Sequence, residues 1–93
     1  MTQAELRMTL GARLAEHGIA RAWLFGSRAR GDERADSDVD LLVDFARRPG
    51  LIAFFGIETA LSDAVGLEVN LVERSALRPD FGRAVQQDAI PVP

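Results

Sequence analysis

The chain has 93 residues, 47% hydrophobic and 27% charged, which is the composition of one small globular domain covering 1–93. It contains no cysteine and no lysine, and this excludes disulfides, thiolate zinc sites, cysteine nucleophiles and Schiff-base chemistry. The net charge of −3 disfavours nucleic-acid binding, and the lack of a signal peptide or long apolar run predicts a cytoplasmic protein with no membrane partner.

The N-terminal part of the chain predicts a helix followed by a buried strand. Thr2 and Glu5 have the spacing of a capping box, and Gly18 is a plausible end of the helix. One face of this helix carries an apolar stripe made of Leu6, Leu10 and Leu14. An apolar run over 19–25 then ends abruptly at Gly26, which is typical of a buried strand.

The rest of the chain alternates between strand and helix patterns. Apolar and acidic residues alternate over 39–45, which predicts a strand with one apolar and one mostly acidic face. A helix is expected over 51–65, a further alternating strand over 67–72, and a short helix over 80–88 before an irregular end. We therefore expect an α/β (α+β) fold with a small mixed sheet of three to four strands packed by helices.

Acidic residues gather at the start of the second predicted strand. Asp38 and Asp40 are two residues apart, so both side chains leave the same face of the strand, with Cα atoms about 6.5–7 Å apart. Two such carboxylates can converge on a divalent cation, and Mg²⁺ is the ion that combines one or two carboxylates with substrate phosphates. Taken alone, the pair also fits a solvated acidic strand face.

A possible phosphate site follows the first predicted strand. Glycine at 26 allows close approach of a ligand to the backbone, and the Ser27 hydroxyl can donate a hydrogen bond to a phosphate oxygen. Arg28 and Arg30 are near enough in sequence to neutralise phosphate charge, although solvated surface arginines would look the same. Taken alone, Gly26-Ser27 is equally consistent with a tight turn.

Together the two features resemble a known motif. Gly26-Ser27-Arg28-Ala29-Arg30-Gly31, a polar spacer and Ser37-Asp38-Val39-Asp40-Leu41 resemble the signature of the minimal nucleotidyltransferase (MNT) family in the DNA-polymerase-beta-like superfamily. The resemblance implies that Asp38 and Asp40 hold one or two Mg²⁺ ions and are catalytic. It also implies a site for the phosphates of ATP, built from Gly26, Ser27, Arg28, Arg30 and Ser37.

The sequence departs from the family pattern on the following strand. The family usually carries a third carboxylate there, whereas this chain has Asn70, which keeps a ligating oxygen but cannot act as a base. We therefore expect Asn70 to be a third catalytic residue, with a chemistry that differs from that of the family's carboxylate. Glu68 lies two residues earlier, and it either substitutes for the missing carboxylate or simply faces solvent.

The resemblance also implies a function and a partner. Stand-alone MNT proteins are similar to antitoxins paired with HEPN-domain RNase toxins, which implies transfer of AMP from Mg-ATP to a hydroxyl of a HEPN toxin. A small-molecule acceptor such as an aminoglycoside would usually need an added substrate domain. The alternative is a catalytically degenerate MNT fold that neutralises the toxin by binding alone.

Overall fold

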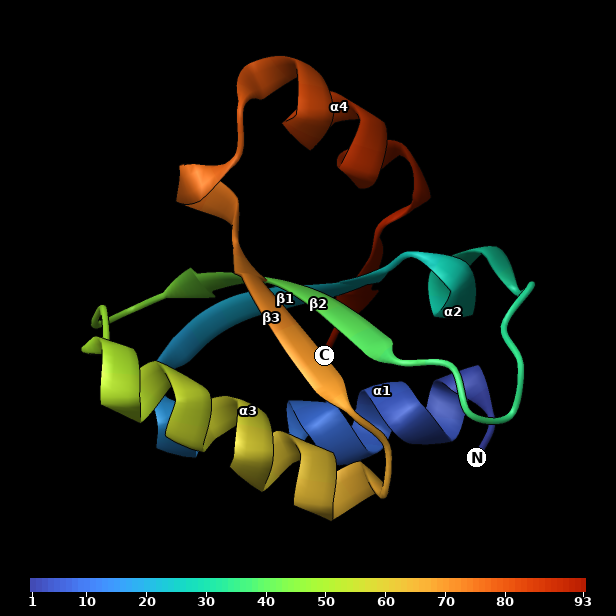
Figure 1. Cartoon of the computed structure of the whole chain (residues 1–93), viewed down its shortest axis with the longest axis horizontal. Helices are drawn as coiled ribbons and strands as arrows, with labels where there is room; N and C mark the ends of the chain where they lie inside the picture. The colour runs from blue at the N-terminus through green and yellow to red at the C-terminus, as the bar shows by residue number, and fades with distance from the viewer.

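The computed structural model describes residues 1–93, the whole chain (Figure 1). Its elements in chain order are α1 (Gln3–Gly11), η1 (Ala15–His17), β1 (Ile19–Phe25), α2 (Ser27–Arg30), β2 (Val39–Phe45), α3 (Leu51–Val65), β3 (Val69–Glu73), η2 (Arg74–Ala76), α4 (Pro79–Asp88) and β4 (Ile90–Val92). None of the helices combines the length and the apolar composition that crossing a membrane requires. The predicted alternation of strands and helices is confirmed.

The strands form one mixed sheet in the order β3-β2-β1-β4. β2 is parallel to β3 and antiparallel to β1, and β1 is antiparallel to β4. The sheet therefore has the four strands at the upper end of the predicted range. Because β2 is a central strand, residues on it have neighbours from both β1 and β3.

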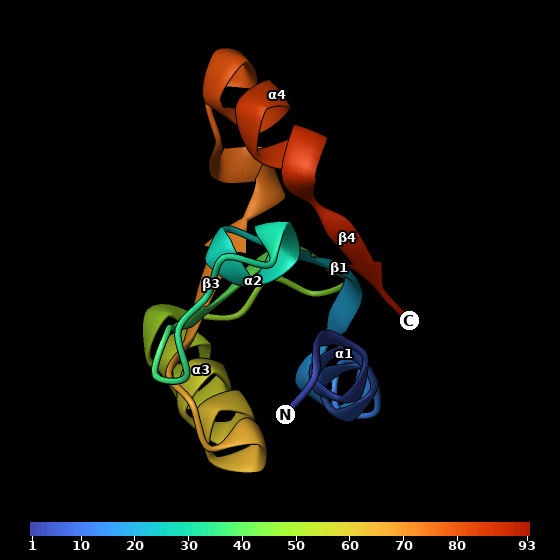
Figure 2. The ribbon, with the colours of Figure 1, turned by 90° about the vertical axis from the view of Figure 1, so that its right-hand side faces the viewer.

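The helices lie on both sides of the sheet, and the two sides differ. α1 and α3 cover one face, whereas α4 stands over the other (Figures 1 and 2). The covered face holds the core, and on β2 it buries residues that are 0% exposed, namely Val39, Leu41 and Val43. The acidic residues of the same strand must point to the opposite face, because successive side chains alternate. That opposite face is called the open face below.

Leu42 departs from the mostly acidic pattern of the open face. It is 0% exposed, yet it lies outside the core cluster beneath the sheet. The β1–β2 register places it opposite Trp23. Part of the open face is therefore apolar and covered.

The first helix begins as predicted but ends earlier. Thr2 accepts a hydrogen bond from the Glu5 N–H, and the Glu5 side chain accepts one from the Thr2 N–H, so the capping box is present. The helix ends at Gly11, and Gly18, with φ of 71°, leads into β1 after a short 3-10 turn. A Cβ atom at position 11 would collide with the carbonyl of Pro93, so glycine there lets the C-terminus pack against the helix.

The C-terminal end is a strand, and the prediction of an irregular end was wrong. Ala22, Trp23 and Leu24 of β1 pair with Val92, Pro91 and Ile90 of β4. Proline lacks an N–H group and so fits only an edge strand, the position that β4 occupies. The pairing closes the sheet next to α1.

Two aliphatic residues of α3 provide a test of where the core lies. Leu61 is 0% exposed, whereas Ile52 at the start of the same helix is 89% exposed, in an apolar patch with Leu51 and Phe55 at that end of α3. Leu61→Ala should lower the free energy of unfolding by about 2–5 kcal/mol, because it leaves a cavity. Ile52→Ala should change the free energy of unfolding by less than about 0.5 kcal/mol. Urea denaturation of both variants measures the difference. Equal effects would contradict the assigned core.

Candidate active site

The sheet register brings the residues of the sequence motif together on the open face. Asp40 lies opposite Phe25, the last residue of β1, and opposite Asn70 of β3. The turn at Gly26 begins directly after Phe25, so it adjoins the Asp40 carboxylate. Residues from three consecutive strands, which are far apart in the sequence, therefore form one site.

Gly26 is the closest neighbour of the acidic pair on the β1 side. Its φ of 73° and ψ of −153° favour glycine, and a Cβ atom there would lie 2.6 Å from Oδ2 of Asp40. Its carbonyl accepts hydrogen bonds from the N–H groups of Ala29 and Arg30, at 3.1 Å each. The first N–H groups of a helix have no acceptor within it, so those of Ser27 and Arg28 at the start of α2 lack an intrahelical partner.

Asn70 lies between the two carboxylates. Its Nδ2 atom is 3.2 Å from Oδ2 of Asp38 and 3.4 Å from Oδ1 of Asp40. An amide that donates to two carboxylates reduces the repulsion between them, because its N–H groups carry partial positive charge. The geometry thus brings the three predicted catalytic residues within contact of one another.

The three side chains fit a divalent cation. They supply two carboxylates and, once the Asn70 amide turns so that its oxygen replaces Nδ2, one amide oxygen, which are the hard ligands that Mg²⁺ accepts. None of the ion pairs of the chain involves Asp38 or Asp40, so no arginine neutralises them. No three acidic, histidine or cysteine side chains are grouped so that they could hold a metal ion, so a cation held here would complete its ligands with water or substrate oxygens.

Arg28 has a structural position that the sequence did not reveal. It is 6% exposed, and its guanidinium donates to the carbonyl of Ser37 at 2.9 and 3.1 Å, and to those of Ala35 and Arg34 at 3.3 and 3.4 Å. Its side chain therefore holds the loop that leads to Asp38. Its predicted contact with a nucleotide phosphate stays a prediction.

Ser37 belongs to the same loop. Its hydroxyl accepts a hydrogen bond of 2.8 Å from the Arg34 N–H, and its carbonyl accepts from Arg28. Ser37 therefore stabilises the approach to β2. Its predicted contact with the nucleotide stays a prediction. Arg30 differs from both, because its half-exposed side chain is held only by Asp32, with a separation of 3.2 Å.

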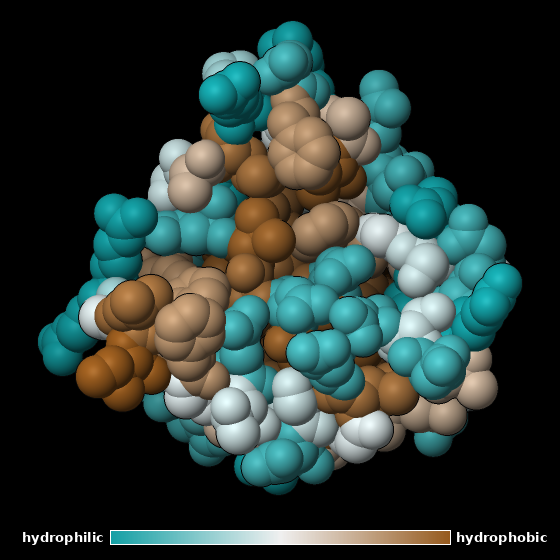
Figure 3. Space-filling view, in the orientation of Figure 1, coloured by the Kyte–Doolittle hydropathy of each residue, from teal (hydrophilic) through white to brown (hydrophobic).

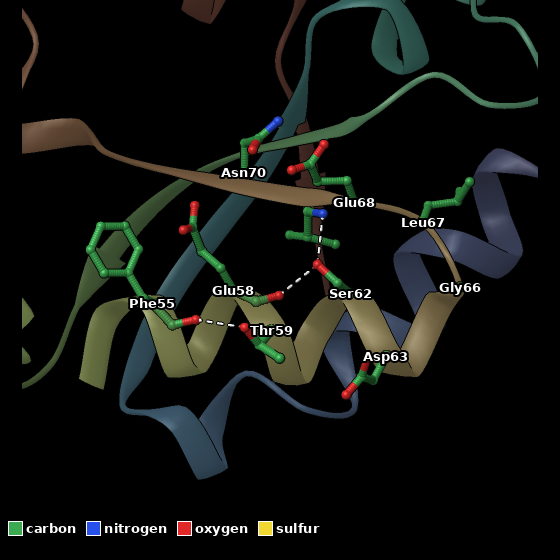
Figure 4. A pocket seen from close by; sticks show the side chains of 10 residues that line it. Phe55, Glu58, Thr59, Ser62, Asp63, Gly66, Leu67, Glu68 and Asn70 are labelled. Atoms are coloured by element: carbon green, nitrogen blue, oxygen red, sulfur yellow. Dashed lines mark hydrogen bonds between the residues drawn. The ribbon is translucent and has the colours of Figure 1, made fainter. Parts of the chain in front are cut away.

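A groove runs between α3 and the outer edge of β3 and ends at Asn70 (Figure 4). It has a volume of about 690 Å³. In Figure 4 the side chains of Glu68 and Asn70 rise on the same side of β3. Glu68 is exposed and forms no acidic group of three with Asp38 and Asp40.

Two residues of α3 that the sequence analysis did not identify hold β3 in place. The Ser62 hydroxyl accepts a hydrogen bond of 2.9 Å from the Val69 N–H, and Oε2 of Glu58 accepts one of 2.8 Å from the Leu71 N–H. These bonds satisfy N–H groups on the outer edge of the sheet, so another strand cannot pair with them. They also fix the backbone on either side of Asn70. The only sequence signal for Glu58 and Ser62 was that both lie on one face of the predicted helix.

Comparison with known proteins shows similarity over most of the chain. A family profile described as a nucleotidyltransferase domain matches residues 6–92. Protein adenylyltransferase MntA of Thermococcus cleftensis is 38% identical over 73 residues, which cover 78% of this chain and 74% of that relative.

Two solved structures share the fold. A candidate minimal nucleotidyltransferase has a TM-score of 0.78 at 36% identity, with 98% of this chain and 96% of that chain covered. A chain from the complex of the tri-AMPylated HEPN toxin of Shewanella oneidensis with its MNT antitoxin has a TM-score of 0.75 at 19% identity. That superposition covers 98% of this chain and 71% of the other.

Two neighbouring arginines test whether Arg28 holds the loop that leads to Asp38. Arg28→Ala removes the guanidinium that donates to three part-buried loop carbonyls and should lower the free energy of unfolding by about 1–3 kcal/mol. Arg30→Ala removes an exposed ion pair and should change it by less than about 1 kcal/mol. Urea denaturation of both variants measures the difference. If Arg28→Ala were as stable as Arg30→Ala and lost only nucleotide affinity, the loop role would be contradicted and the phosphate-binding prediction supported.

Proposed function

The chain belongs to the nucleotidyltransferase domain family, and on that basis we propose that it transfers AMP from ATP to a hydroxyl group of a protein partner. The observation that carries the proposal is the convergence of Gly26, the Asp38–Asp40 pair and Asn70 at one end of the sheet. The similarity to protein adenylyltransferase MntA supports AMP as the transferred group and a protein as the acceptor.

Each part of the site has a role in this proposal. The turn at Gly26 and Ser27 would bind the β- and γ-phosphates through backbone N–H groups and the serine hydroxyl, with Arg30 within reach of the same phosphates. Asp38 and Asp40 would hold one or two Mg²⁺ ions, and Asn70, whose Nδ2 faces them in the free chain, would turn its amide to add an oxygen. Bound Mg²⁺ supplies charge stabilisation of the transferred group and a lower pKa of the attacking hydroxyl.

The reaction is an in-line displacement at the α-phosphorus. The acceptor oxygen forms a bond to this phosphorus, the bond to the β-phosphate oxygen breaks, and pyrophosphate leaves on the side of Gly26 and Ser27. The hydroxyl proton passes to a carboxylate of the pair or to water, because the Asn70 amide has no basic site. Asn70 therefore orients the carboxylates and takes no part in the proton transfer.

We further propose that the partner is a HEPN toxin, for which this chain acts as the antitoxin. The fold shared with a chain of the HEPN–MNT complex of Shewanella oneidensis supports this partner. A second candidate function follows from Asn70. A site without the third carboxylate would bind the nucleotide and the toxin but neutralise the toxin by complex formation alone.

Intact-mass spectrometry separates the two functions. The complex with the HEPN partner is incubated with ATP and Mg²⁺, and an adenylyl-sized mass gain on the partner is expected. Asp38→Asn combined with Asp40→Asn should reduce the rate of this gain at least about a hundredfold, because the cation ligands are lost. Asp36→Asn combined with Asp80→Asn carries the same charge change at exposed positions and should behave as the wild type. A stable complex that binds ATP and gains no mass would favour neutralisation by binding alone.

Asn70→Asp tests the third position of the site. Three clustered carboxylates repel one another, so the variant should have a lower melting temperature than the wild type without metal, and Mg²⁺ should raise it more than it raises that of the wild type. Transfer activity with saturating Mg²⁺ should be retained or increased. A sharp loss of activity with normal Mg²⁺ binding would mean that the amide itself is required.

A further inference from the structure

The open face of the sheet carries an aromatic and cationic cluster beyond the acidic pair. Trp23 lies two positions before Phe25 on β1, so its side chain shares the face of Asp40. The Cζ atom of Arg74 is 4.9 Å from the Trp23 ring centroid, and that of Arg21 is 5.9 Å away. Two planar cationic groups therefore flank one indole ring.

Asp44 holds these two arginines in place. Arg74 donates to both of its carboxylate oxygens, at 2.9 and 2.6 Å, and Nη2 of Arg21 lies 3.3 Å from Oδ2. The hydrogen bonds from Arg74 lower the pKa of Asp44 below its usual value, so Asp44 remains charged at neutral pH. The indole and the Arg74 guanidinium are thus fixed relative to each other before any ligand binds.

A small cavity adjoins this cluster beneath the C-terminal end of α4. It has a volume of about 210 Å³. Its lining is formed by Trp23, Arg74, Gln86, Ala89 and Pro91. Figure 3 shows apolar surface where α4 faces the sheet, in the middle of that view. The cavity therefore offers the part of the indole that the arginines leave open, the Arg74 guanidinium, apolar walls and one amide.

We propose that this cavity binds the base of the nucleotide whose phosphates lie at Gly26 and Asp40. The inference rests on the proposed function, because it places the other half of the same ligand. Nucleobases stack on aromatic rings and on arginine planes, and a glutamine amide can donate to and accept from the edge of a base. The lining supplies these three kinds of contact through Trp23, Arg74 and Gln86.

The position of the cavity relative to the acidic pair fits a single nucleotide. Phe25 lies opposite Asp40, and Trp23 is about 6.6 Å further along the same strand. The attacking and leaving oxygens occupy one axis through the α-phosphorus, so the ribose must leave sideways from that axis. In the direction of Trp23 the ribose and base meet the apolar part of the open face, where Leu42 lies opposite Trp23.

The fluorescence of Trp23 gives a direct test in the full-length chain. The chain has one tryptophan and no tyrosine, so the emission comes from Trp23 alone. In the presence of Mg²⁺, ATP should quench this emission, because a stacked base lies against the indole. The quenching should reach a plateau as the ATP concentration rises. Inorganic tripolyphosphate, which has the phosphates without the base, should compete with ATP but leave the emission nearly unchanged.

Two adjacent glutamines supply a matched pair of variants on exposed positions of α4. Gln86 lines the cavity and Gln87 does not. Gln86→Ala should weaken ATP binding about threefold to tenfold in calorimetry and leave tripolyphosphate binding unchanged, since it removes a hydrogen bond to the base. Gln87→Ala should change neither. Trp23→Leu should weaken ATP binding at least about tenfold and spare tripolyphosphate.

The outcomes distinguish this inference from the proposed function. Equal effects of ATP and tripolyphosphate on Trp23 emission, with Gln86→Ala and Gln87→Ala indistinguishable, would overturn the base site while leaving the phosphate site intact. If neither ATP nor tripolyphosphate bound to the chain, the proposed function and the base site would both be refuted.

Discussion

The site depends on keeping two like charges side by side without a neighbouring arginine. Asp38 and Asp40 lie within contact of one amide, and no ion pair of the chain involves either of them. Folding tolerates this repulsion because Val39, between them, is 0% exposed and its N–H donates to the Glu68 carbonyl at 2.7 Å. A shift of one residue would turn both aspartates into the core, so the buried valine fixes their direction.

Asn70 changes the balance between stability and ion binding at this pair. Its amide offsets part of the repulsion between Asp38 and Asp40 when no ligand is bound, whereas a third carboxylate would increase that repulsion. The same amide contributes no negative charge to a bound cation. Cation binding at this site should therefore depend more on the phosphates of a nucleotide than it would with three carboxylates. Nucleotide and metal are expected to bind together.

Much of the fold and the central part of the site could be predicted from the sequence, because they rest on local patterns. The alternation over 39–45 correctly gave the direction of Asp38 and Asp40. The contacts of Arg28 with the loop carbonyls and the pairing of β4 with β1 were missed. Both sets of contacts join segments that come together only in the folded chain. In the sequence, an arginine that binds loop carbonyls looks the same as one that binds a phosphate.

The arginines of the open face are distributed unevenly over its acidic residues. Arg21 and Arg74 are near enough to the acidic residues of β2 to neutralise one of them, but both are bound to Asp44. The lowered pKa of Asp44 means that this cluster stabilises the fold above the unfolded-state pKa, and the contribution is lost as the pH falls through the folded-state value. At neutral pH Arg21 and Arg74 are therefore both paired with Asp44, at the end of β2 away from Asp38 and Asp40. Asp38 and Asp40 have no such partner, and this difference separates the proposed binding site from Asp44, which the protein has neutralised itself.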